Sequence, residues 1–270
     1  MNFLNKPLAF IKRDFLNEIS YRLSFIMQIF GILVSILTFY FLARLFGSAV
    51  VPYLKPYGGD YFSFVIIGVA FSNYQEVAMY SLSRSIRDAQ ITGTLEALLV
   101  TQTEIPTIIL SSSLYSFLFT SLRVIAYLLL GSLFFGMDIS HANYFAAAVI
   151  LVLTITSLSS FGIISASFVM VFKKGDPITW LFLSVSWFLG GVYYPVAVLP
   201  AWLLKLSYLL PITHSLEGMR MSLLQGASLT ALLPNVLALL AFTFVMLPVS
   251  VMVFRYAVNQ AKRDGSLTQY

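Results

Sequence analysis

Residues 144–172 read YFAAAVILVLTITSLSSFGIISASFVMVF, a run of 29 residues that contains no charged side chain. About 20 consecutive apolar residues are enough for an α-helix to cross the hydrocarbon core of a bilayer, which is about 30 Å thick. The run is long enough to cross a membrane even when the helix is tilted. It predicts a transmembrane helix.

The composition of the whole chain agrees with this interpretation. Of its 270 residues, 59% are hydrophobic and only 10% are charged, whereas soluble domains carry about 25% charged residues. No soluble fold of this length hides so much apolar surface from water. The composition excludes an ordinary soluble protein.

Five further apolar stretches can be interpreted as membrane spans. With the first they make six: 23–46, 61–82, 106–135, 144–172, 177–194 and 232–254. The fifth is the weakest, because Gly190, Gly191 and Pro195 interrupt it. We expect an all-α membrane protein with about six transmembrane helices. A single domain would cover 1–270, with the spans in 23–255 and a cytoplasmic tail at 256–270.

Basic residues are distributed unequally between the two sides of this arrangement. With both termini in the cytoplasm, the inner segments hold eleven of the 16 Lys and Arg residues, the outer segments hold four, and Arg123 lies within a span. The positive-inside rule then predicts cytoplasmic termini, and we expect the inner membrane of a bacterium or archaeon. The net charge of +5 follows from this topology, so nucleic acid is not an expected partner. No cleavable signal peptide is expected, since the first long apolar run starts only near Leu23.

The segment 1–22 has the pattern of an amphipathic helix. Apolar side chains recur at spacings of three and four residues, and these are Leu4, Leu8, Ile11, Phe15 and Ile19. Such a helix lies in the membrane interface with its basic side toward anionic lipid. A simple topology anchor is the alternative interpretation.

Catalytic and nucleotide-binding motifs are missing from the sequence. There is no cysteine, and the two histidines, His141 and His214, have no zinc-binding HExxH spacing. Neither a GxSxG nucleophile motif nor a GxxxxGK[ST] phosphate loop is present. We expect that the chain is not an enzyme and binds no metal or cofactor itself.

Polar and aromatic side chains within the spans suggest a substrate path, although each has a simpler interpretation. Glu76 shares a helix face with Asn73 and Tyr80; this face could line a polar entry, form interhelical hydrogen bonds, or let Glu76 reach the inner headgroups. Deeper aromatic residues could line a cavity or simply face lipid. The expected path residues are Phe71, Asn73, Tyr74, Glu76, Phe182 and Trp187. For Arg123, the expected partner is Glu217.

Two segments between spans have distinctive patterns. The inner loop 83–105 contains a short apolar stripe at Ile91, Leu95, Leu98 and Leu99. It predicts a short cytoplasmic helix that could dock in a groove of a partner protein. The outer segment 188–220 is too apolar for a solvated loop, and its prolines prevent it from crossing the membrane. It predicts a re-entrant helical hairpin, which must be buried against protein.

These two segments resemble those of the permease subunits of type 2 ABC transporters, a group that includes bacterial drug, lipid and polysaccharide exporters. Residues 93–101, GTLEALLVT, are similar to the family's Gly-Thr-Leu-Glu segment after the second span. Residues 190–220, which contain GGVYYP and LLPITHSLEGMR, are similar to its second signature. The resemblance covers nearly the whole chain.

The resemblance implies a set of partners. Two permeases pair, as a homodimer or a closely related heterodimer, and two ATP-binding subunits carrying ATP and Mg dock beneath them. The residues implied in coupling to the ATPase are Arg13, Phe15, Arg87, Asp88, Gly93, Thr94, Leu95, Glu96, Lys173, Lys174 and Asp176. The hairpin implied to cap the outer end of the pathway contains Tyr194, Pro195, Pro200, Pro211, His214 and Glu217.

The expected function is ATP-driven export of an amphipathic, lipid-like or lipid-linked substrate by alternating access. An ion-coupled secondary carrier is the main alternative, although the sequence shows neither inverted repeats nor a relay of intramembrane carboxylates. A membrane scaffold or sensor without transport activity is a further alternative.

Overall fold

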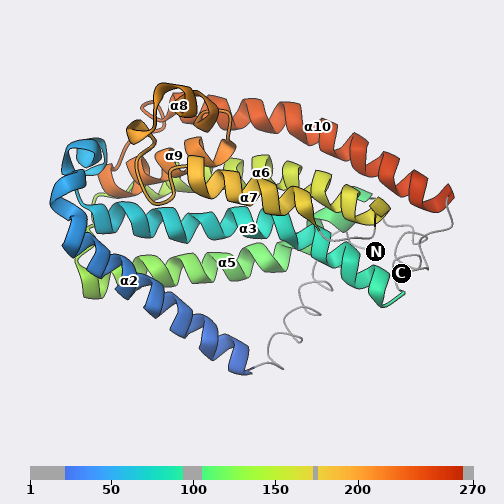
Figure 1. The fold of residues 1–270 in the computed structure, drawn as a ribbon, viewed down its shortest axis with the longest axis horizontal. Coiled ribbons are helices and arrows are strands. Elements are labelled where there is room, and N and C mark those ends of the chain that lie inside the picture. The colour runs from blue at the N-terminus through green and yellow to red at the C-terminus, as the bar shows by residue number, and fades with distance from the viewer. Residues whose placement is uncertain (1–21, 94–104, 173–175, 264–270) are drawn as a thin grey trace.

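The computed structural model describes residues 22–93, 105–172 and 176–263, and every regular element in those ranges is a helix (Figure 1). The expected N-terminal helix at 1–22 and most of the GTLE segment lie outside the described residues. The long helices are α2 (Arg22–Leu54), α3 (Tyr61–Ile91), α5 (Ile105–Phe135), α6 (Tyr144–Phe172) and α10 (Leu233–Arg263). The all-α membrane fold is confirmed.

Five helices are long and apolar enough to cross a membrane, and a sixth apolar helix is shorter. The sixth is α7 (Pro177–Leu189), which has 13 residues. At about 1.5 Å per residue it reaches about 20 Å, less than a bilayer core. It ends earlier than the expected 177–194 because Gly190 caps the helix and Gly191 turns the chain at a φ of 76°.

Three helices extend further than the sequence suggested, and the first of them, α2, ends at Leu54, eight residues beyond the expected end of its span at 46. α3 continues through the first nine residues of the expected inner loop, from 83 to 91, because no glycine or proline interrupts it there. It ends at Ile91, and Gly93, two residues further on, has a φ of 67°, which suits the position just after a helix. Similarly, α10 continues to Arg263, nine residues beyond the expected end of the last span.

α3 is the central helix of the bundle. It lies beside α5 and α6 in Figure 1 and is mostly buried, whereas α2 and α10 bury few of their side chains and expose many large apolar ones. In a lipid solvent such exposed apolar faces need no cover. We call the end of the bundle near Ile91 and Phe172 the Ile91 end, and the opposite end, near Tyr61 and Tyr144, the hairpin end.

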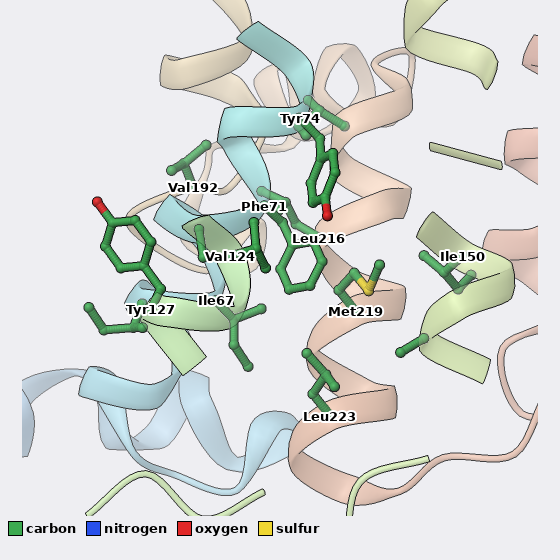
Figure 2. Packing of buried hydrophobic residues seen from close by; sticks show 14 of the residues in the cluster. Ile67, Phe71, Tyr74, Val124, Tyr127, Ile150, Val192, Leu216, Met219 and Leu223 are labelled. Atoms are coloured by element: carbon green, nitrogen blue, oxygen red, sulfur yellow. The ribbon is translucent and has the colours of Figure 1, made fainter. Parts of the chain in front are cut away.

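The main core lies between α3, α5, α6 and the later helix α9 (Pro211–Gln225). Figure 2 shows Phe71 and Tyr74 of α3 directed toward Leu216 and Met219 of α9. The two aromatic rings of α3 stack at 5.9 Å, and the Tyr74 hydroxyl donates to Ser121 Oγ of α5 at 2.8 Å. The core holds the hairpin end of α3 in one position.

The start of α3 gives a first prediction. Both carboxylate oxygens of Asp60 cap the helix, accepting from the backbone N–H of Phe62 at 3.3 Å and of Ser63 at 2.8 Å. Replacing Asp60 with alanine is expected to lower the free energy of unfolding by about 1 kcal/mol, whereas asparagine should preserve most of the cap. Thermal unfolding of the detergent-purified protein measures both. An equal loss in both variants would show that capping is not the role of this side chain.

Candidate functional site

The segment between α7 and α10 folds as a hairpin of two short helices. After a turn at Val196–Val198, α8 (Ala201–Ser207) and α9 follow, with Pro200 at the N-cap of α8 and Pro211 as the first residue of α9. Proline suits these positions because the first N–H groups of a helix have no intrahelical acceptor. Most of α9 is buried, against α3, α6 and α10. This burial is what a helix needs if it enters a membrane without crossing it.

Arg220 of α9 is the central residue of the hairpin. Its side chain is 3% exposed and donates three hydrogen bonds to backbone carbonyls. Nε donates to Phe64 O at 3.0 Å, Nη1 to Gly191 O at 2.8 Å and Nη2 to Val192 O at 2.9 Å. The guanidinium carbon also lies 3.5 Å from the centre of the Phe64 ring. One side chain thereby joins α9, the turn after α7 and the first turns of α3.

Gly68 provides the space that this arrangement needs. A Cβ at this position of α3 would lie 2.2 Å from Val192 O and 2.4 Å from Nη2 of Arg220. Tyr57, in the turn before α3, interacts electrostatically with Arg220 and Glu217. Burial, reinforced by the charge of Glu217, raises the pKa of Tyr57 to about 12, so its hydroxyl remains protonated.

The expected hairpin residues hold the shape of this segment. The Tyr194 hydroxyl donates to Phe188 O, and Pro195 is buried. His214 Nε2 donates to Tyr208 O at 3.0 Å, which ties α9 to the end of α8.

Glu217 is half-buried, and the ionisable groups that act on it are His214 and Arg220. Arg123 is placed elsewhere: its Nε donates to Gln28 Oε1 of α2 at 3.1 Å, and its guanidinium lies 5.1 Å from the Phe119 ring. The expected Arg123–Glu217 pair is therefore wrong. The sequence contained no cue for the register of α2 against α5, which decides this contact.

The residues expected to form a substrate path are placed in different surroundings. Phe71 and Tyr74 belong to the main core, being 5% and 2% exposed. Asn73 donates to carbonyls of its own helix, at Val69 and Ala70. Phe182 packs on Phe161 of α6 with ring centres 4.5 Å apart.

Glu76 and Trp187, the remaining two path candidates, both lie near Tyr193. Glu76 is half-buried at the middle of α3, within electrostatic range of Arg84, Arg123 and Tyr193. The ring of Trp187 lies 5.6 Å from that of Tyr193. These two residues, unlike Phe71 and Tyr74, remain outside the main core.

The structure describes only part of the expected coupling surface. Arg87 and Asp88 are exposed in the last turn of α3, and Gly93 is exposed just beyond it. Asp176 caps α7, with Oδ1 accepting from the N–H of Thr179 at 2.9 Å. The remaining residues lie outside the described ranges: Arg13, Phe15, Thr94, Leu95, Glu96, Lys173 and Lys174.

Several side chains that organise the molecule were missed in the sequence. Arg220 was counted only as an outer basic residue. Its one visible cue is its place beside an apolar stripe of α9 formed by Ile212, Leu216, Met219 and Leu223. Gly68, which makes room for Arg220, has no cue of its own. Among the described residues, no group of three metal-ligating side chains is found.

Comparison with known protein families identifies the chain. The family model described as ABC-2 type transporter matches residues 8–224, which is most of the sequence. A search of curated proteins found no match. The matched range includes the GTLE segment and nearly all of the hairpin built around Arg220, and the apolar helices make the chain a multi-pass membrane protein. The chain therefore belongs to the ABC-2 type transporter family and is the membrane subunit of an ABC transporter, which works with an ABC ATPase partner.

Proposed function

We propose that two copies of this chain form the permease of an exporter that moves an amphipathic, lipid-like or lipid-linked substrate out of the cytoplasm or the inner leaflet. Two ATPase subunits, which bind ATP and Mg, dock at the Ile91 end. That end is cytoplasmic in this proposal, with both termini on the same side of a bacterial or archaeal inner membrane. The chain itself performs no catalytic step.

The observation that carries this proposal is the continuity of α3. The helix runs without a break from the Asp60 cap at the hairpin end to exposed Arg87 and Asp88 at the Ile91 end. It is also the most buried of the spanning helices. A displacement of the residues that follow α3 is therefore transmitted along a rigid element to the position where Arg220 holds the hairpin.

This geometry supports alternating access. In the proposed cycle, dimerisation of the ATPases upon ATP binding moves the Ile91 ends of the two permeases together. Because Arg220 bonds to the first turns of α3, the hairpin follows α3 at the opposite end. Glu76 and Trp187, which remain outside the main core, are the path residues retained in this proposal.

Recovery of the ATPase with this chain tests the proposal. A mild-detergent pull-down from native membranes, followed by mass spectrometry, is expected to recover an ATP-binding subunit. Changing Leu95 and Glu96 together to alanine is expected to abolish the recovery, because both are proposed to lie in the docking surface.

A matched control lies at the other end of the bundle. Leu209 and Lys205 are exposed on the hairpin, so their double alanine variant removes one leucine and one charge without touching the docking surface. It should recover as much ATPase as the unchanged protein. If the ATPase is absent in every detergent, the exporter proposal fails, and ion-coupled transport becomes the function to test.

A further inference from the structure

The Ile91 end contains a second packed cluster, distinct from the main core. Its members come from the last turns of three helices, α3, α6 and α10, which are far apart in the sequence. They are Leu82, Ile86, Ile163, Ala166, Met170, Phe254, Ala257, Val258 and Ala261, each at most 3% exposed. Closely packed interiors are displaced as units and do not deform continuously.

A buried amide joins two of these helices beyond the cluster. Gln90 is 5% exposed, and its Nε2 donates to Met170 O at 3.2 Å. Met170 lies in the last turn of α6, where helix carbonyls lack intrahelical donors. The bond therefore links the last turn of α3 to the last turn of α6.

The turn from α6 to α7 is tied to the same body. Asp176 Oδ1 accepts from the Ser165 hydroxyl of α6 as well as from the N–H of Thr179. The Thr179 hydroxyl donates to Ser165 Oγ at 2.8 Å. The chain thus leaves α6 at Phe172, and four residues later, at Asp176, it is again hydrogen-bonded to α6.

We infer that these parts form one rigid coupling block, consisting of the Ile91 ends of α3, α6 and α10 and the first turn of α7, with Gln90 as its positioning residue. The inference rests on the proposed function, in which the ATPase docks at the Ile91 end, where both segments that carry expected coupling residues, 93–104 and 173–176, are attached. Each segment starts from this block, at Thr92 and at Phe172. A force applied by the ATPase to either segment therefore displaces both, and Gln90 sets their relative orientation.

The chain has no cysteine, which allows a direct distance measurement. Ile91→Cys and Phe172→Cys are placed at positions that are 57% and 58% exposed, one on each side of the Gln90 bond. Spin labels at these sites are measured by pulsed electron spin resonance in lipid nanodiscs, with the labelled chain diluted in excess unlabelled chain so that only the distance within one chain is recorded. They are expected to give one narrow distance distribution. In the complex with the ATPase, the distance should be the same with and without nucleotide.

Gln90→Leu is expected to broaden this distribution. In proteoliposomes, it should lower the amount of a fluorescently labelled phospholipid, used as the probe, that is transported per ATP hydrolysed by about fivefold, the factor that corresponds to one buried hydrogen bond. ATPase recovery in the pull-down should be unchanged. Where the leucine variant fails to fold, Gln90→Met, which keeps the length of the side chain, replaces it.

Gln75→Leu is the matched control. Gln75 is on the same helix and is 0% exposed, but its side-chain atoms have no hydrogen-bond partner among the described residues. The identical substitution there should leave the distance distribution and the transport ratio unchanged.

Two results would overturn the inference: a label distance that shifts with nucleotide in the unmodified block, or equal behaviour of the two leucine variants. The width of the distance distribution, and its broadening by Gln90→Leu but not by Gln75→Leu, is measured in nanodiscs on the chain without an ATPase. A failed pull-down would therefore reject the proposed function and leave the test of the block intact.

Discussion

Gly162→Ala is expected to be the most damaging single-methyl change in the spanning helices. A Cβ at Gly162 of α6 would lie 1.9 Å from Ala78 O and 3.2 Å from the Cα of Met79, both of them backbone atoms of α3. Neither atom can move aside as a flexible side chain would. The two helices must separate, and the expected loss in the free energy of unfolding is about 3 kcal/mol, the upper range for overpacking.

The measurement is thermal stability followed by size-exclusion chromatography in detergent, where Gly162→Ala should shift the protein toward aggregate. Gly31→Ala is the control, because a Cβ on this glycine of α2 meets nothing within 4 Å. Its expected effect is zero or a small gain of up to about 1 kcal/mol from helix propensity. Equal stability of the two variants would contradict the close approach of α3 and α6.

Features that depend on local sequence were predicted well. Long apolar runs predicted the spanning helices, because a bilayer sets a minimum length that few other structures require. The prolines of the outer segment predicted a helical hairpin, and Pro200 and Pro211 lie at the starts of its two helices, α8 and α9, where proline is tolerated. Gly190 and Gly191 indicated that the fifth span is interrupted, but the end of α7 was predicted five residues too late.

Features that depend on contacts between distant segments were not predicted. Gly162 is one of 15 glycines in the sequence, and only the packing of α6 on α3 distinguishes it from Gly31. Gln75 and Gln90 are chemically identical, but only Gln90 has an acceptor, at Met170 O. Phe71 and Tyr74 were expected to line a path or to face lipid, and their burial in the main core, at 5% and 2% exposed, was not expected. The position of α9 decides whether these two side chains are buried, and no local sequence pattern predicts that position.

Arg220→Met is expected to release the hairpin while the other end of the bundle stays folded. Methionine fills part of the space of the arginine side chain but donates no hydrogen bond. The carbonyls of Gly191 and Val192 then lose their donors inside the protein, and each buried unsatisfied group costs about 1–3 kcal/mol. The total expected loss is about 3 kcal/mol. Arg220→Lys should recover at most part of it, because an ammonium group lacks the planar fork that reaches three acceptors.

Hydrogen–deuterium exchange locates this loss in the structure. Exchange should rise in the hairpin, residues 190–226, and in the first turns of α3, and stay unchanged at the Ile91 end, which packs through its own cluster. Lys205→Met, which removes an exposed basic side chain from α8, should change neither region. Gly68→Ala should reproduce the pattern of Arg220→Met, since its Cβ would lie 2.4 Å from Nη2 of Arg220 and displace the guanidinium group. If exchange rose equally at both ends, Arg220 would stabilise the whole fold and not the attachment of the hairpin to α3 in particular.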